Sequence, residues 1–165
     1  MEAPGRARTL PIQGALNRIV RALLRVPLLC RLVGRRLITV YVVGRISGRR
    51  YAVPVAYTQC GDVLLVGTPF SWGRNLRAGD PVEIRLKGRR RWADVDVLVD
   101  EADVTETYAI MARDNHQFAK FNKIRLDDAG NPDPRDLHLA WSAGARAFRL
   151  RPLLGAPGKT TEAVG

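Results

Sequence analysis

The feature that most constrains the fold of this chain is a basic turn between two β-branched segments, residues 42–57 (V-V-G-R-I-S-G-R-R-Y-A-V-P-V-A-Y). Ser-Gly between two such segments indicates a β-hairpin, because Gly48 accepts the positive φ that a short connection requires. The turn, residues 44–50, carries three arginines and no acid. Arginine presents a planar set of donors to phosphate or carboxylate oxygens. The turn therefore predicts an anion-binding hairpin; the alternative is a solvated basic turn that prevents edge pairing.

Length and composition indicate one soluble globular domain. The chain has 165 residues, of which 46% are hydrophobic and 26% are charged, and this length is sufficient to bury a core. Cys30 and Cys60 are too few and too far apart for a metal cluster, a C-x-x-C redox pair or a disulfide framework. We therefore expect a protein of the reducing cytoplasm.

The net charge of +11 is distributed unevenly along the chain. Residues 1–50 hold eleven arginines and one acid, whereas residues 51–165 hold 16 basic and 15 acidic side chains. The excess positive charge therefore belongs to the N-terminal segment and to the hairpin turn. Three kinds of partner fit such a charge: nucleic acid, an anionic membrane surface or a polyanionic small molecule.

The N-terminal segment, residues 1–36, predicts a basic amphipathic helix. Between residues 12 and 24 apolar side chains recur at helical spacing and arginines lie on the other faces. Arginine recurs too often for a membrane span, and no signal-peptide core is present. The helix either covers an open side of the sheet or lies in a membrane interface. In the second case residues 12–36 bind an anionic membrane surface, and the protein is peripheral at the inner face of the membrane.

Residues 37–152 predict a mainly β domain with helices, an α+β fold. Six segments have strand-like patterns: residues 37–43, 50–59, 63–67, 82–86, 92–99 and 145–150. Pro54 places its strand at an edge or a bulge. Mostly antiparallel hairpins with helices at the ends favour a small closed or split barrel over a doubly wound sheet.

Helices are expected at residues 71–79, 102–121 and 133–141. Ser71 is the predicted N-cap of the first helix, which Gly79 ends, and Asp133 is the predicted N-cap of the third. The composition of residues 153–165 predicts a disordered tail.

The sequence lacks the common motifs of hydrolytic, nucleotide and metal chemistry. H-E-x-x-H, G-x-S-x-G, a Walker loop and G-x-G-x-x-G are all absent. His116 and His138 have no ligand one helical turn away, and residues 127–133 lack the glycine position of a calcium loop. We expect no metal site, so redox or transfer chemistry would require an organic cofactor.

Two segments together resemble the deazaflavin-dependent nitroreductase family of actinobacteria. They are Gly44-Arg45-Ile46-Ser47-Gly48, with Pro54 six residues on, and Trp72-x-x-Asn75-Leu76, which a strand led by Pro81 follows. The resemblance extends over residues 37–99. It implies a six-stranded antiparallel split β-barrel, similar to that of the flavin-mononucleotide-binding proteins, with an N-terminal helix and two or three further helices.

The resemblance also implies binding of the deazaflavin coenzyme F-420, whose phosphodiester and oligoglutamate tail are polyanionic. The residues implied to bind it are Arg45, Ser47, Gly48, Arg49, Arg50, Gly67, Thr68, Trp72 and Asn75. Fixed cations and backbone N–H groups of the turn suit such a tail on physical grounds. An alternative role for Trp72 is to anchor the short helix in the core.

The implied activity is that of an oxidoreductase, in which the reduced coenzyme passes a hydride to a quinone, nitroaromatic or enone acceptor. Tyr57 and Tyr108 are the candidate catalytic donors; core packing is the alternative role for both. A second hypothesis is a non-catalytic split barrel that binds a lipid, haem or flavin mononucleotide. This hypothesis is consistent with Ile46 and Tyr51, because many members of the family have lysine at the first position and arginine at the second.

Two further expectations concern partners. Nucleic acid is the weakest of the three charge-based candidates, because the basic half of the chain lacks interleaved aromatic platforms. The resemblance implies a homodimer, since split barrels of this size often bury an open face against a second copy.

Overall fold

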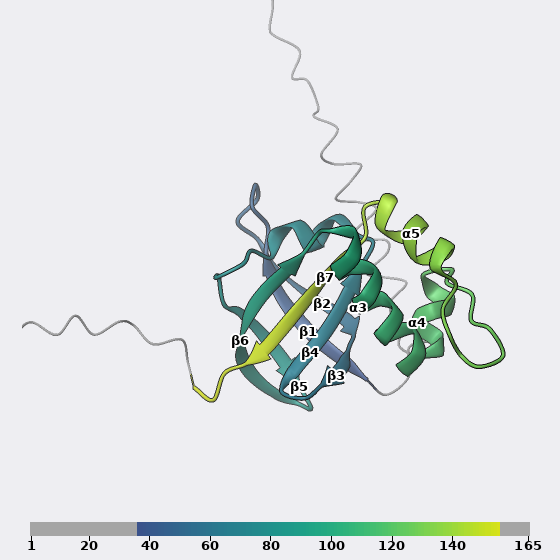
Figure 1. Cartoon of the computed structure of the whole chain (residues 1–165). Helices are drawn as coiled ribbons and strands as arrows, with labels where there is room; N and C mark the ends of the chain where they lie inside the picture. The colour runs from purple at the N-terminus through teal and green to yellow at the C-terminus, as the bar shows by residue number, and fades with distance from the viewer. Residues whose placement is uncertain (1–35, 156–165) are drawn as a thin grey trace, which may run out of the picture.

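A computed structural model describes residues 36–155, which form a curled β-sheet with three α-helices gathered on one side (Figure 1). The strands are β1 (Leu37–Val43), β2 (Arg50–Ala56), β3 (Thr58–Cys60), β4 (Val63–Thr68), β5 (Val82–Leu86), β6 (Arg89–Leu98) and β7 (Arg146–Pro152). The helices are the 3-10 helix η1 (Ser71–Asn75), α3 (Glu101–Asp114), α4 (His116–Phe121) and α5 (Pro134–Ser142). The mainly β, α+β class is confirmed. The predicted N-terminal helix and most of the predicted tail lie outside the described residues.

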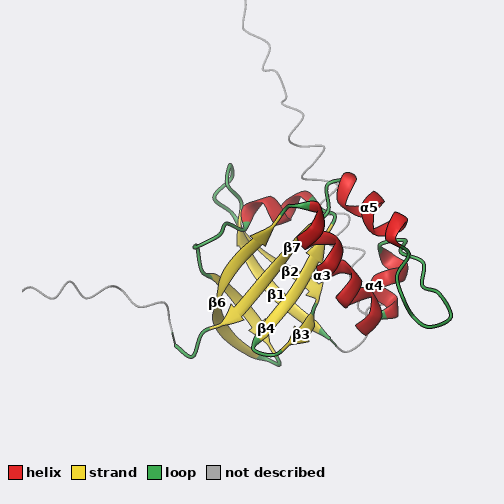
Figure 2. Cartoon of the chain, viewed as in Figure 1, coloured by secondary structure: helices red, strands yellow, loops and turns green. Residues whose placement is uncertain are grey.

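The sheet is antiparallel throughout, in the order β2-β1-β5-β6-β7-β4-β3. Strands β2 and β3 stand at opposite ends of this order, although only Tyr57 separates them in the chain. The backbone N–H of Tyr57 donates to the carbonyl of Arg36 at 3.2 Å. Because one continuous segment supplies both ends, the sheet must curl round to bring them together (Figure 2).

The predicted count of six strands is wrong, because the segment predicted as one strand, residues 50–59, forms two. At Tyr57 the chain stops pairing with β1 and begins to pair with β4, so that β2 and β3 are separate strands. The prediction that Pro54 lies at an edge is confirmed, since β2 has one neighbour in the sheet.

The predicted helix over residues 102–121 is also divided. Asn115 has an extended backbone, and its side-chain oxygen accepts hydrogen bonds from the N–H groups of Gln117 and Phe118, at 3.0 and 3.2 Å. Asn115 therefore caps α4 and ends α3, although the apolar pattern continues across it. The cap assigned to Ser71 is wrong: Phe70 occupies the N-cap position of η1 without a side-chain hydrogen bond.

Two apolar clusters lie on opposite faces of the sheet. The inner cluster draws one side-chain face from six strands and includes Val40, Val53, Val66, Ile84, Val95 and Phe148, with Trp72 beside them. The outer cluster lies under the helices and includes Leu65, Val104, Tyr108, Met111, Phe118 and Ala147. Alternation along the strands produces both faces, because successive strand residues point to opposite sides. Within residues 36–155, no helix has both the length and the apolar character needed to cross a bilayer.

Candidate functional site

The loop between β1 and β2 is a closed turn that protrudes beyond the strand ends (Figure 1). The N–H of Gly44 donates to the carbonyl of Arg49, and the N–H of Gly48 donates to the carbonyl of Gly44, both at 2.8 Å. Gly48 has a φ of +62°, the left-handed region that the Ser-Gly pair predicts. A Cβ at Gly48 would meet no atom within 4 Å, so this side of the loop is open.

Asn75 joins this loop to the Trp72-x-x-Asn75 segment. Its side-chain oxygen accepts a hydrogen bond from the backbone N–H of Arg45 at 3.2 Å. Its amide group donates to the carbonyl of Trp72 at 3.0 Å, which fixes the side chain within η1. The two sequence segments that carry the resemblance are therefore in direct contact, although 30 residues separate Arg45 from Asn75.

The loop has unused hydrogen-bond donors. The side chains of Arg45 and Arg49 are exposed, and within the described part of the chain no carboxylate pairs with either. The backbone N–H groups of Ile46 and Ser47 likewise have no acceptor among residues 36–155. The Ser47 hydroxyl lies 3.3 Å from the N–H of Arg49 and 3.2 Å from the hydroxyl of Tyr51, which holds the loop shape. The loop therefore presents two guanidinium groups and two N–H groups, a set suited to an anion.

Arg50, predicted with this group, is instead engaged on the outer face of the sheet. It forms an ion pair with Glu83, which also pairs with Arg90 at 3.1 Å. The guanidinium groups of Arg50 and Arg90 both lie over the ring of Tyr41, 4.8 and 4.9 Å from its centroid. Arg50 is thus less available to a ligand of the loop than Arg45 or Arg49.

The side chains predicted near the coenzyme ring are mostly buried. Thr68 is 2% exposed, and its hydroxyl accepts from the N–H of Phe70 at 3.1 Å. Trp72 is 5% exposed and stacks on Phe148 with a centroid distance of 6.4 Å, so it anchors η1 in the core as the packing interpretation predicts. A Cβ at Gly67 would lie 2.7 Å from the ring of Tyr108, so this glycine makes room for that ring.

The two candidate catalytic tyrosines are not brought together. Tyr57 is 6% exposed and belongs to the inner cluster, whereas Tyr108 is fully buried in the outer cluster. The hydroxyl of Tyr108 has no hydrogen-bond partner among the described residues. Burial raises the pKa of this phenol well above its usual value, so it stays protonated at physiological pH.

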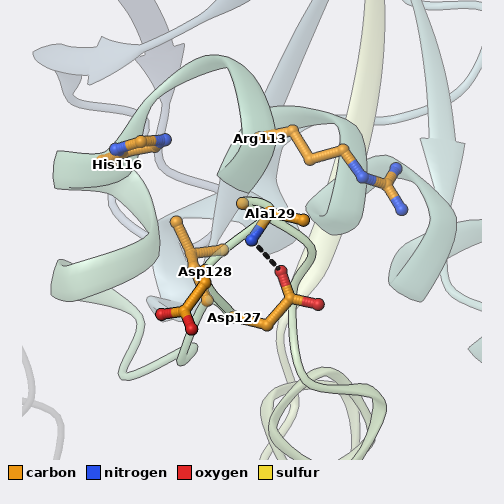
Figure 3. Close-up of a pocket in the computed structure, with 7 residues that line it drawn as sticks. Arg113, His116, Asp127, Asp128 and Ala129 are labelled. Carbon is orange, nitrogen blue, oxygen red and sulfur yellow. Dashed lines mark hydrogen bonds between the residues drawn. The ribbon is translucent and has the colours of Figure 1, made fainter.

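The aspartate-rich loop after α4 is held by its own hydrogen bonds. The carboxylate of Asp127 accepts from the N–H groups of Ala129 and Asn131 at 2.9 and 2.8 Å, and the bonds from Asn131 do most to hold its pKa below the usual range. Asp127 lines a surface pocket of about 470 Å³ together with Arg113 and His116 (Figure 3). Its oxygens are occupied by these loop contacts, so they stabilise the turn.

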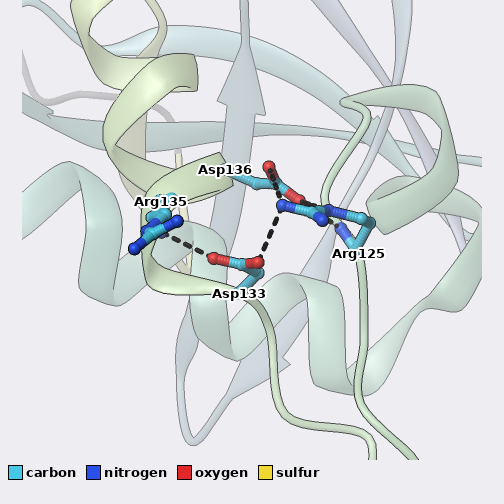
Figure 4. Close-up of polar contacts among 4 residues, drawn as sticks. All are labelled: Arg125, Asp133, Arg135 and Asp136. Atoms are coloured by element: carbon cyan, nitrogen blue, oxygen red, sulfur yellow. Dashed lines mark hydrogen bonds and ion pairs between the residues drawn. The ribbon is translucent and has the colours of Figure 1, made fainter.

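A second set of contacts ties the same loop to α5. Arg125 pairs with Asp133 and Asp136, each at 2.8 Å, and lowers the pKa of Asp136 (Figure 4). Asp133 also accepts from the N–H of Arg135 at 2.8 Å, which confirms it as the N-cap of α5. His138 on this helix contacts Glu101 at 2.6 Å. These contacts connect α5 to the loop after α4 and to the start of α3.

The sequence interpretation missed a second basic cluster, on the β5–β6 hairpin. Residues 85–91 read R-L-K-G-R-R-R, with five cations and no acid. A charge count over short windows finds this cluster, whereas the sum over residues 51–165 does not, because acidic residues elsewhere offset it.

Comparison of the chain with known protein-family models finds no match, and comparison with curated proteins finds no similar protein.

Proposed function

We propose that the chain binds the deazaflavin coenzyme at the β1–β2 loop and acts as an oxidoreductase on a quinone, nitroaromatic or enone acceptor. The observation that carries the proposal is the hydrogen bond from the Arg45 N–H to Asn75, because it joins the two segments of the resemblance into one surface.

The loop residues fit the polyanionic part of the coenzyme. Arg45 and Arg49 would pair with phosphate or carboxylate oxygens, and the free N–H groups of Ile46 and Ser47 would donate to the same group. Asn75 fixes the loop before a ligand arrives, which reduces the entropy lost on binding.

The residues near the expected ring position fit a narrower role. Because the side chains of Thr68 and Trp72 are buried, this segment would contact a ring mainly through its backbone. The bound coenzyme supplies the hydride. The part of this chain would be to hold the ring against the acceptor in a fixed orientation.

The split barrel is part of the same proposal. The support is the division at Tyr57, where one segment leaves one end of the sheet and joins the other. The break at Tyr57 would let this one segment pair with β1 on one side and with β4 on the other, which would close the curled sheet into a barrel.

One observation favours the second candidate, a non-catalytic split barrel that binds a lipid, haem or flavin mononucleotide. Both candidate donors are buried, Tyr57 at 6% exposure and Tyr108 completely, so neither presents its ring to a ligand at the surface. On this alternative the loop would bind an anionic group of the ligand without any transfer reaction.

The test is a fluorescence titration of the purified full chain with the deazaflavin coenzyme. We expect micromolar or tighter binding, and a loss of roughly 10- to 100-fold in affinity for each of Arg45→Ala and Arg49→Ala, since a hydrogen bond to a charged group contributes about 1.5–3 kcal/mol. Arg135→Ala removes an exposed arginine from α5 and is the matched control.

Two outcomes would contradict the proposal. The first is an absence of binding at micromolar coenzyme, and the second is an equal affinity of the loop variants and the control. Coenzyme binding without reduction of any quinone, nitroaromatic or enone would support the second candidate, as would a haem or flavin absorbance of the purified protein.

A further inference from the structure

Most of the outer face of β1, β2, β5 and β6 lies outside the cluster under the three α-helices that the structure describes. Ala56 and Leu98, at the ends of β2 and β6, belong to or pack against that cluster. Helix α3 packs on β3, β4 and β7, and α4 and α5 pack on α3, so the helices gather on one side of the sheet (Figure 2). The inner sides of these four strands face the inner cluster. Their outer sides therefore form a separate surface, which we call the basic face.

The cations of the basic face lie close together. It carries Arg50, Arg85 and Arg90 on the strands and Lys87 at the β5–β6 turn. Arg89 and Arg91 pair with Leu86 and Ile84 of the inner side, so they do not belong to this face. Arg50 and Arg90 share the acid Glu83. Asp94 and Asp96 lie further along the outer side of β6, where their cross-strand partners are Arg151 and Arg149 of β7. Arg85 and Arg90 are direct cross-strand partners. Like charges in that position destabilise a sheet, so the fold alone does not account for them.

The described chain is electrically polarised. Residues 36–99 and 144–155, which form the sheet and its loops, hold 14 basic and 5 acidic side chains. Residues 100–143, which form the helical side, hold 5 basic and 9 acidic side chains. An extended anionic surface would attract the sheet side and repel the helical side, so it would orient the molecule.

Aromatic and apolar side chains lie among these cations. Tyr41 and Trp92 are half-buried on the same outer side, as the pairing of each with Glu83 shows. Val43, next on β1, is 55% exposed. Arginine together with tyrosine and tryptophan is typical of protein surfaces at the headgroup level of a bilayer.

We propose that the basic face docks the protein on an anionic lipid bilayer. A lipid surface is favoured over single-stranded nucleic acid because Arg50 and Arg90 already lie over the Tyr41 ring, which leaves it poorly available for stacking on a base. This docking is separable from the proposed coenzyme site. Of the residues implied to bind the coenzyme, Arg50 alone belongs to the basic face, and it pairs with Glu83.

The test is co-sedimentation of the full chain with vesicles of phosphatidylcholine, with and without phosphatidylglycerol. We expect binding to the anionic vesicles that weakens with salt, and a roughly 30-fold loss of partitioning for Arg85→Gln/Lys87→Gln, from about 1 kcal/mol per cation near the surface. The matched control, Lys120→Gln/Arg135→Gln, removes two exposed cations from the helical side and should bind as the unmodified chain does.

Residues 1–35 contain seven arginines, so the design must separate their contribution. Unchanged partitioning of Arg85→Gln/Lys87→Gln would assign vesicle binding elsewhere and overturn the proposal, as would an equal loss in the control. A second readout locates the contact: anionic vesicles should shift tryptophan emission to the blue, and Trp92→Phe should abolish most of that shift.

Two further measurements test the docking proposal. Salt-sensitive binding of single-stranded DNA without any vesicle binding would overturn the proposal. Unchanged coenzyme affinity of Arg85→Gln/Lys87→Gln, alongside lost vesicle binding, would show that docking is separate from the proposed function. Circular dichroism of each variant establishes that it is folded.

Discussion

The buried hydroxyl of Tyr108 offers a test of whether this side chain serves packing or chemistry. Tyr108 is fully buried, its ring forms a T-shaped contact with Phe118 at a centroid distance of 5.2 Å, and its hydroxyl has no partner within residues 36–155. Leaving a hydroxyl unpaired in a protein interior costs about 1–3 kcal/mol. Tyr108→Phe removes that cost and keeps the ring contacts.

The expected gain is smaller than the full cost, because the missing oxygen leaves a small void, and voids cost about 24 cal/mol per Å³. We expect the free energy of unfolding to rise by about 1–2 kcal/mol. For a chain of this length that gain corresponds to an increase in Tm of about 2–8 °C. Urea and thermal denaturation followed by circular dichroism measure both quantities.

Tyr51→Phe is the matched control, since the Tyr51 hydroxyl does have a partner, Ser47 at 3.2 Å. Its loss should lower stability by about 0.5–1.5 kcal/mol. A Tyr108→Phe protein that is less stable than the unmodified chain would refute the reasoning, because the hydroxyl would then have a favourable partner. Loss of acceptor reduction in a stabilised Tyr108→Phe protein would instead restore Tyr108 as a catalytic donor.

Three other predictions follow from the local contacts of one residue each. Gly67→Ala places a Cβ 2.7 Å from the Tyr108 ring, and overpacking of this kind should lower the free energy of unfolding by about 1–3 kcal/mol in urea denaturation. Asn75→Ala removes two hydrogen bonds and should speed amide exchange in the β1–β2 loop while the sheet core stays protected. The lowered pKa of Asp127 implies that its contribution to stability is complete above its usual pKa of 3.8 and is lost as pH falls through the lower folded value. Asp127→Asn should remove this loss of stability at low pH. A chemical-shift titration of the unmodified chain that finds an ordinary pKa for Asp127 would contradict this prediction.

Local patterns predicted most of the elements, because alternation and turn residues act over short distances. The Ser-Gly pair predicted the β1–β2 hairpin, and the pair Asp133-Pro134 predicted the start of α5. Tyr57 and Asn115 produced the main errors. At each of these residues the backbone changes direction within a pattern of hydrophobicity that continues, so periodicity alone could not locate the break.

The site was predicted in part. The sequence paired the loop with the segment of Asn75, and the two are in contact. Burial could not be predicted from residue type for Thr68 and Trp72, because their exposure depends on how η1 packs against Phe148. The ion pair of Arg50 with Glu83 could not be predicted either, because it depends on the register of β2, β1 and β5.

The central claim is that the loop and the η1 segment form one coenzyme site. Hydrogen–deuterium exchange of the full chain, with and without saturating deazaflavin coenzyme, tests it most directly. We predict slower amide exchange at residues 44–49 and 72–76 together, with unchanged exchange at residues 125–136. Coenzyme binding that leaves both segments unprotected, or that protects residues 125–136 instead, would contradict the account.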